Sequence, residues 1–263
     1  MVQNHTKMTQ GPLILAIETS SRIGSVAIAR GAEVLAETSF SAPMRHSAEI
    51  FPAICRLLDR FGLKAGQIEH VYLSIGPGSF TGLRIATTLA KTMHLANAVK
   101  VIAVDTLDVV AANVIHLTAP NIGPVPNQDS PAWNHQSIAT ILDAKRGQFF
   151  VALYRCETLG RREVTADAIW RKVLPDSLMT SSQFLARFAC KERPIWLLGD
   201  GLVYYRDKFQ AKGIHFVDEQ YWRARAGNVG LLGWQMALQE KFADPLTLTP
   251  NYLRKPDVTI KPR

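Results

Sequence analysis

The spacing of apolar residues divides most of the chain into short strands and amphipathic helices. Apolar runs bounded by turn signals predict strands over residues 13–18, 24–29, 33–38, 71–75, 99–104, 137–143, 149–154 and 194–198. Apolar residues at three- and four-residue spacing predict helices over residues 47–61, 81–95, 107–117, 181–188 and 226–241. This mixture of elements indicates the α/β class.

The pattern changes most sharply at residues 71–95. A buried strand ends at the turn Gly76-Pro77-Gly78-Ser79, and a helix follows with Ser79 or Thr81 as its N-cap. A glycine-rich turn before a helix leaves backbone N–H groups that can bind an anion. The spacing fits neither a P-loop, which needs Lys-Ser/Thr after its last glycine, nor the dinucleotide fingerprint. A tight strand–helix corner that binds nothing explains the same residues.

Composition places the chain among globular proteins. Its 263 residues, 47% hydrophobic and 20% charged, suffice for one large domain or two lobes. No run approaches the ~18–20 apolar residues that span a bilayer, and residues 1–11 lack the apolar segment of a secretory signal. The isolated Cys55, Cys156 and Cys190 favour a reducing compartment. We therefore expect a cytoplasmic protein.

The net charge of +8 favours contact with tRNA or with an acidic partner. The basic residues are scattered, however, apart from Arg161-Arg162 and the chain ends, and no nucleic-acid motif accompanies them. A solvated basic surface is the simpler interpretation.

Several segments together resemble the bacterial TsaB family, also called YeaZ. They are L-A-I-E-T-S-S at 15–21, S-V-A at 25–27, R-H-S at 45–47, G-P-G-S-F-T-G-L-R-I at 76–85, L-D-A-K-R-G at 142–147 and P-N-Y-L-R at 250–254. Family members are non-catalytic paralogues of TsaD, which installs threonylcarbamoyl on adenosine 37 of tRNAs. The resemblance implies a duplicated actin-like ATPase fold, of the ASKHA or Gcp-like type, with two lobes of mixed β-sheets flanked by helices.

With this fold in view, the chain divides into five parts. We expect a disordered tail over residues 1–11, an N-terminal lobe over 12–117, a proline-rich linker or loop over 118–137, a C-terminal lobe with its closing helix over 138–254, and a basic tail over 255–263.

The resemblance also suggests where a nucleotide would bind. In actin-like proteins an acidic residue at the end of the first strand helps to arrange a metal, and nearby hydroxyls approach phosphate. This chain has Glu18 where the family usually has Asp. The candidate phosphate contacts are Thr19, Ser20, Gly76, Gly78, Ser79 and Asp143. Two simpler interpretations remain: hydroxyls that only satisfy the turn after Glu18, and a charged hairpin of Asp143 with Lys145 and Arg146.

The metal site of TsaD is not expected in this chain. TsaD has the run N-H-L-x-G-H, whose two histidines hold the metal. Thr106 and Val110 stand at the corresponding positions. A valine has no donor atom, and a hydroxyl is a weak ligand for such metals. The resemblance thus implies no metal site, no catalytic residue and no intrinsic cofactor.

The helices over residues 47–61 and 81–95 form the face that meets another subunit in the family. The candidate interface residues are His46, Ile50, Ile54, Arg84, Ala86, Leu89, Ala90 and Met93, although core packing would give the same pattern.

The function implied is that of a non-catalytic subunit that dimerises with, and activates, a TsaD-like enzyme acting on tRNAs that read ANN codons. A TsaE-like ATPase completes the expected complex, ATP or ADP is allowed at the partner interface, and the same face could form a homodimer. The alternatives are a free-standing actin-like phosphotransferase that uses Thr19 and Asp143, a peptidase-like enzyme of the M22 type, and an RNA-binding module supported by net charge alone.

Overall fold

The structure is a computed structural model that describes residues 11–115, 137–158 and 168–254. The predicted tail over residues 1–11 lies outside the described residues except for residue 11. The predicted tail over residues 255–263 and nearly all of the predicted proline-rich segment also lie outside them. The chain forms two compact units. Unit 1 comprises Met1–Ile75, Thr81–Val104 and Arg225–Thr249, and unit 2 comprises Gly76–Phe80, Asp105–Ala224 and Pro250–Arg263.

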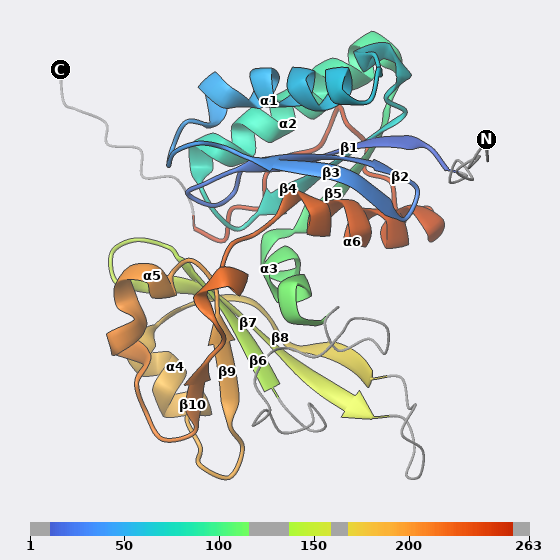
Figure 1. Ribbon diagram of the computed structural model, residues 1–263. Helices are drawn as coiled ribbons and strands as arrows, with labels where there is room; N and C mark the ends of the chain where they lie inside the picture. The colour runs from blue at the N-terminus through green and yellow to red at the C-terminus, as the bar shows by residue number, and fades with distance from the viewer. Residues whose placement is uncertain (1–10, 116–136, 159–167, 255–263) are drawn as a thin grey trace, which may run out of the picture. The chain divides into compact units, whose positions relative to one another are not determined.

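Unit 1 is built on a five-stranded sheet of order β3-β2-β1-β4-β5. Its strands are β1 (Leu13–Glu18), β2 (Ser25–Arg30), β3 (Glu33–Ser39), β4 (His70–Gly76) and β5 (Lys100–Asp105). Strand β1 is antiparallel to β2 and parallel to β4. Helices α1 (His46–Arg60) and α2 (Phe80–Asn97) cover one face of the sheet, and α6 (Ala226–Leu238) covers the other (Figure 1).

Unit 2 repeats this topology. Its strands are β6 (Ser137–Asp143), β7 (Gln148–Thr158), β8 (Ala168–Thr180), β9 (Ile195–Leu198) and β10 (Ile214–Phe216). They are ordered β8-β7-β6-β9-β10, with β6 antiparallel to β7 and parallel to β9. Its helices are α3 (Thr106–Ile115), α4 (Ser181–Phe188) and α5 (Leu202–Tyr205), with short 3-10 turns at Arg206–Phe209 and Glu219–Tyr221. The predicted duplication of two mixed sheets flanked by helices is confirmed.

Alternation along the strands explains how each sheet acquires two covered faces. In β1, Leu15 and Ile17 belong to the core under α1 and α2. Ala16 points to the opposite face, where it lies against Gly230 of α6. Helix α6 can approach this closely because glycine leaves room. A Cβ at Gly233 would lie 2.5 Å from the ring of Tyr72 in β4.

The division into units corrects the predicted lobe boundaries at two helices. Residues 226–241 were predicted to close the C-terminal lobe, but α6 packs on the unit 1 sheet. Residues 107–117 were predicted in the N-terminal lobe, but α3 belongs to unit 2. Each helix lies next to a point where the chain passes from one unit to the other. The periodicity of a helix alone does not show which of the two sheets it covers.

Among the strands and α-helices of the described residues, three were not predicted, namely β8, α5 and β10. Strand β8 carries Lys172, Pro175 and Asp176, which interrupt the apolar pattern. It lies at the edge of its sheet, where a proline is tolerated. In the part of the chain that the structure describes, no helix has the length and apolarity needed to span a membrane.

Candidate functional site

The end of β1 carries a buried carboxylate surrounded by hydroxyls. Glu18 is fully buried, and its Oε1 accepts the Ser20 backbone N–H at 2.7 Å, the Ser20 hydroxyl at 2.6 Å and the Ser21 backbone N–H at 3.1 Å. Its Oε2 accepts the hydroxyl of Ser74 in the neighbouring strand β4. Burial raises the pKa of Glu18, and the hydrogen bonds from Ser20, Ser74 and Ser21 offset part of that rise.

This network changes the interpretation of the hydroxyls that follow β1. Thr19 is also fully buried, and its hydroxyl donates to the Gly82 carbonyl at 2.8 Å. The candidate phosphate contacts Thr19 and Ser20 thus already donate to protein oxygens. The simpler interpretation, that these hydroxyls satisfy backbone groups of the turn, is only partly right. Thr19 donates to a backbone carbonyl of α2, and Ser20 donates to the Glu18 side chain. A phosphate contact at either residue would require these bonds to be replaced.

The glycine turn leads directly into α2. Gly76 is buried with a φ of 117°, and α2 begins at Phe80, so Ser79, not Thr81, has the N-cap position. Gly78 and Ser79 are half-buried. The Phe80 ring stacks on Tyr252 of the P-N-Y-L-R segment, with ring centroids 4.5 Å apart. Anion binding at Gly76, Gly78 and Ser79 stays a prediction.

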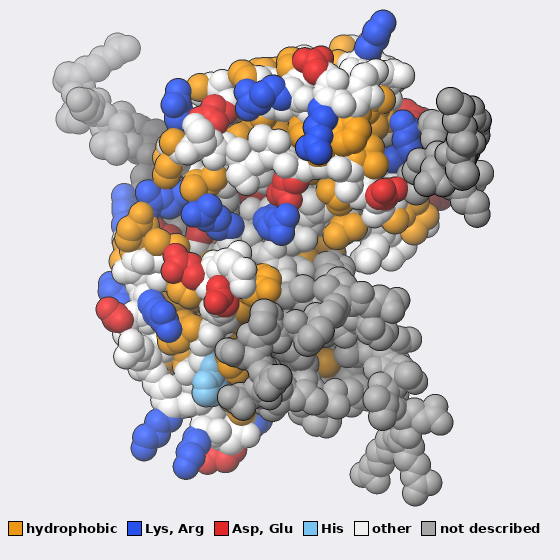
Figure 2. Space-filling model, in the orientation of Figure 1, with side chains coloured by type: hydrophobic (Ala, Val, Ile, Leu, Met, Phe, Trp, Pro, Cys, Tyr) orange, Lys and Arg blue, Asp and Glu red, His pale blue; other side chains and the backbone are white. Residues whose placement is uncertain are grey.

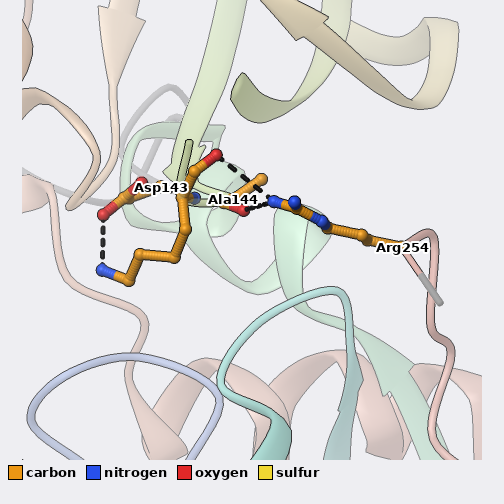
Figure 3. Close-up of polar contacts among 4 residues, drawn as sticks. Asp143, Ala144 and Arg254 are labelled. Atoms are coloured by element: carbon orange, nitrogen blue, oxygen red, sulfur yellow. Dashed lines mark hydrogen bonds and ion pairs between the residues drawn. The ribbon is translucent and has the colours of Figure 1, made fainter. Parts of the chain in front are cut away.

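Asp143 is engaged with the turn that follows it. Its Oδ1 accepts the Lys145 backbone N–H at 2.7 Å, and its Oδ2 pairs with the Lys145 Nζ at 2.6 Å. From the other side, Arg254 donates to the Ala144 carbonyl at 2.8 Å (Figure 3). Lys145 and Arg146 have φ values of 64° and 55°, which are uncommon for residues with side chains. The geometry agrees with the charged hairpin, and the contact of Arg254 with this turn was not predicted.

Thr106 and Val110 lie one helical turn apart at the start of α3, and both are fully buried. The Thr106 hydroxyl has no hydrogen-bond partner among the described residues. Within those residues, no group of three or more His, Cys, Asp and Glu side chains could hold a metal ion. The two residues stand where the resemblance places metal-binding histidines, and they offer one weak donor.

A charged cluster at the same junction was missed by the sequence analysis. The Lys172 Nζ lies 2.8 Å from Asp108, 2.5 Å from Asp176 and 3.6 Å from Asp105, and the Tyr154 hydroxyl donates to Asp108 at 2.5 Å. Burial would lower the pKa of Lys172, but Asp108 and Asp176 outweigh it and raise that pKa. The cluster joins α3 to β7 and β8 within unit 2. It could not be predicted because β8 itself was not predicted.

Most of the predicted interface residues are core residues. Ile50, Ala86 and Ala90 are fully buried, and Ile54 and Leu89 are nearly so. These five side chains belong to the core cluster of unit 1, and Met93 packs against that cluster. The prediction that they form a partner surface is therefore corrected. The more apolar face of each helix packs on its own sheet.

The His46 side chain is also buried, and its ring centroid lies 5.7 Å from that of Phe40. Burial lowers the pKa of His46. Only Arg84 among the predicted interface residues is exposed. The exposed faces of the two helices carry different residues. Among them are Ser47, Ala48, Phe51, Pro52 and Cys55 on α1 and Thr81, Arg84, Thr88, Thr92 and Leu95 on α2.

Comparison with known proteins decides the family. The family model described as TsaD, tRNA N6-adenosine threonylcarbamoyltransferase, matches residues 34–173, which is more than half of the chain. A curated TsaB from Buchnera aphidicola subsp. Acyrthosiphon pisum is 32% identical over 168 residues, which cover 63% of this chain and 69% of that protein. The chain belongs to the TsaB proteins of the TsaD family.

One further TsaB protein and one solved structure match along nearly the whole chain. The Bacillus subtilis protein named "tRNA threonylcarbamoyladenosine biosynthesis protein TsaB" is 28% identical over 252 residues, which cover 94% of this chain and 96% of that protein. The solved structure of YeaZ from Pseudomonas aeruginosa has the same fold, with a TM-score of 0.69 at 17% identity over 92% of this chain and all of that chain. The family and the Gcp-like fold that the sequence motifs implied are confirmed.

Proposed function

We propose that this chain is a TsaB subunit in the biosynthesis of threonylcarbamoyladenosine on tRNA, and that it dimerises with and activates a TsaD-like threonylcarbamoyltransferase. The observation that carries the proposal is the start of α3, where Thr106 and Val110 are both buried. The resemblance to TsaD aligns these two residues with its metal-binding histidines, and neither side chain is a good metal ligand. Its curated relatives carry the name of this pathway. The chain acts through its enzyme partner and has no catalytic residue of its own.

The buried network around Glu18 supports a non-catalytic role. In an actin-like enzyme the carboxylate and hydroxyls at this point would face metal and phosphate. Here Ser20 and Ser74 donate to the Glu18 carboxylate, and Thr19 donates to the Gly82 carbonyl. Groups that stabilise one another in this way are already satisfied without a ligand.

The exposed faces of α1 and α2 are the proposed contact surface for the enzyme. Met44, Phe51 and Leu95 are 62%, 60% and 73% exposed, which is high for large apolar side chains. Small side chains at Ala48 and Thr88 accompany them and would let a helix approach closely. Hydrophobic side chains are visible among polar ones over this part of the molecule (Figure 2). Because the surface mixes apolar and polar side chains, it suits a partner that binds reversibly rather than permanently.

The remaining components of the complex follow from the same proposal. A TsaE-like ATPase joins the pair, the substrates are tRNAs that read ANN codons, and ATP or ADP binds at the interface with the partner. The complex works in the cytoplasm. A second copy of the chain can use the same face in the absence of the enzyme, because two-fold pairing places one surface against itself.

Size-exclusion chromatography with the TsaD-like protein of the same organism tests the proposal. The informative variant is Phe51→Arg combined with Thr88→Arg, since both side chains are exposed and the changes leave the core intact. Substitutions at Ala86 or Ala90 would be unsuitable because they would overpack a buried site. The matched control is Val203→Arg in α5 of unit 2, an apolar residue that is 46% exposed.

We expect the wild type and Val203→Arg to co-elute with the enzyme and to support modification of tRNA, measured by mass spectrometry of its nucleosides. The double variant should elute separately and lose at least about tenfold in activity, because two charges at an interface cost several kcal/mol. A wild-type chain that neither co-elutes nor stimulates modification would contradict the proposal. Steady ATP turnover by the isolated chain would favour the phosphotransferase alternative instead.

A further inference from the structure

Two surface turns of unit 2 are fixed side by side at the end of the sheet where β9 and β10 begin. The first, residues 190–194, precedes β9, and the second, residues 211–213, precedes β10. The Arg193 backbone N–H donates to the Cys190 carbonyl at 3.3 Å, and the Ile195 backbone N–H donates to the Gly213 carbonyl at 2.8 Å. Gly213 has a φ of 80°, and a Cβ there would lie 2.1 Å from the Cys190 oxygen. The turns therefore touch through their backbones.

These adjoining turns carry three cationic side chains. Lys191, Arg193 and Lys212 are all exposed. The acidic residue between them, Glu192, accepts the thiol of Cys190 at 3.0 Å. Figure 2 shows Lys and Arg side chains at this end of unit 2, at the lower edge of the view. Cations held together on adjoining turns repel one another, and a polyanion bound across them would relieve that repulsion.

An aromatic pair continues from the cationic turns along the same two strands. Trp196 of β9 and His215 of β10 are register partners, and their rings stack with centroids 5.0 Å apart and planes 28° from parallel. His215 is exposed and Trp196 is half-buried, at the sheet edge that β10 forms. Arg193 and Lys212 each precede a member of this pair by three residues. Sites that bind single-stranded RNA typically combine cations, which contact phosphates, with a flat aromatic surface, which stacks on a base.

We propose that Lys191, Arg193 and Lys212, with the Trp196–His215 pair, form an RNA contact site that binds the phosphodiester backbone of the substrate tRNA. The identity of the RNA rests on the proposed function, whereas the polyanion chemistry rests on the residues themselves. An acidic protein surface would use the cations but has no need of the stacked rings, so RNA fits the whole site better. The site lies within unit 2, and the α1–α2 face lies within unit 1, so one chain can contact enzyme and RNA through separate surfaces.

Binding of the isolated full chain to unmodified tRNA, measured by fluorescence anisotropy over a series of salt concentrations, tests the site. The variant is Lys191→Ala, Arg193→Ala and Lys212→Ala together. The control is Arg60→Ala, Lys64→Ala and Lys241→Ala, which removes as many exposed cations from unit 1. Each lost phosphate contact should reduce the slope of log affinity against log salt by about 1. We expect the triple variant to lose about 3 from this slope and on the order of tenfold in affinity at low salt, and the control to lose far less.

A second variant tests the aromatic part of the site. His215→Ala removes an exposed ring and should weaken binding by about fivefold without changing the salt slope, because stacking releases no counterions. Equal affinity and slope for the wild type and the Lys191, Arg193 and Lys212 variant would overturn the proposal. The proposal would also be overturned if this triple variant bound tRNA normally but no longer co-eluted with the TsaD-like enzyme. That result would mean that the three cations contact an acidic surface of the enzyme.

The modification reaction separates this inference from the proposed function. If the wild type stimulates the TsaD-like enzyme and the triple variant raises the KM for tRNA, both stand. If the wild type stimulates the enzyme and the triple variant has an unchanged KM, only the RNA site is overturned. If the wild type has no effect on modification but its tRNA binding depends on the three cations, the proposed function fails and the RNA site stands.

Discussion

At the scale of single residues, Glu18 illustrates how an acidic side chain can belong to the protein interior. Its carboxylate receives hydrogen bonds from Ser20 and Ser21 in the following turn and from Ser74 in β4. The bonds connect the end of β1 to its parallel neighbour and fix the turn that follows. The cost of burying the carboxylate is reflected in its raised pKa. Its surroundings are those of a structural group rather than of a metal ligand.

The raised pKa of Glu18 predicts a dependence of stability on pH. At pH values above 4.5, the ordinary pKa of a glutamate, Glu18 of the unfolded chain releases a proton that the folded chain still holds. The folded state then binds more protons, so the free energy of unfolding falls as the pH rises. Glu18→Gln keeps the shape of the side chain but does not ionise. Relative to this variant, the wild type should lose stability between about pH 4.5 and pH 7, as measured by urea unfolding.

Two controls accompany this measurement. Below pH 4 both side chains are neutral, and the difference in stability between the wild type and Glu18→Gln should be small and constant. Glu18→Ala should lose about 2–4 kcal/mol relative to the wild type below pH 4, because the donors of Ser20, Ser21 and Ser74 would be buried without an acceptor. This loss should shrink as the pH rises, because the variant has no carboxyl group to titrate at this position. A difference between the wild type and Glu18→Gln that stays flat from pH 4 to pH 7 would contradict the prediction.

At the scale of elements, the sequence predicted the strands and helices better than it predicted their surfaces. The helix at residues 181–188 was predicted with its bounds, and in the structure Thr180 and Gln183 form a capping box at its start. In α1, Phe51 is apolar but 60% exposed, so apolar residues lie on more than one side of this helix. A helix with apolar residues on more than one side gives two candidate buried faces, and local spacing does not choose between them. The resemblance to the family, and not local spacing, assigned the core residues Ile50 and Ala90 to a partner surface.

The candidate site divides in the same way. The sequence identified Glu18, Thr19 and Asp143 as polar residues at strand ends, and the structure places them there. It did not reveal that Lys172 and Arg254 complete the clusters at Asp108 and Ala144. Those contacts join residues 64 or more positions apart, for which a single sequence carries no signal.

The close approach of α6 to its sheet predicts that Gly233 tolerates no side chain. A Cβ would lie 2.5 Å from the Tyr72 ring, which is fully buried and whose hydroxyl is 2.8 Å from the His70 Nδ1. Since the ring is held at both ends, α6 must move away. Gly233→Ala should therefore lose about 2–4 kcal/mol in the free energy of unfolding, although alanine favours helices. The matched control Gln235→Ala, exposed on the same helix, should change stability by less than about 0.5 kcal/mol. Equal stabilities would show that the helix adjusts without cost.

At the scale of the whole molecule, the two units share a topology but expose different kinds of surface. Both units keep three antiparallel strands followed by two further strands on the other side of the first. Unit 1 exposes a mixed apolar face on α1 and α2, whereas unit 2 exposes cations and a stacked aromatic pair at one end of its sheet. Duplication fixes where the core lies in each unit and leaves the outer surfaces to diverge. The two proposed contacts therefore arise from residues that the shared fold does not constrain.

The cysteines provide a direct readout of which surface the enzyme partner covers. Cys55 is exposed on the outer face of α1, Cys156 is buried, and Cys190 is half-buried in unit 2. At about ten times the dissociation constant, the TsaD-like partner leaves only about a tenth of the chain unbound. Alkylation of Cys55 by a maleimide should then slow about tenfold, while alkylation of Cys190 keeps its rate, as followed by peptide mass spectrometry.

The same reaction without the partner distinguishes pairing of the chain with itself. If two copies use the α1–α2 face, the rate at Cys55 should fall as the concentration of the chain alone rises, because only unpaired chains expose the thiol. Phe51→Arg with Thr88→Arg should abolish both effects, since those side chains share the exposed faces with Cys55. Full-rate alkylation of Cys55 within a complex that still co-elutes would mean that the enzyme binds elsewhere. In that case the exposed apolar side chains of α1 and α2 would require another explanation.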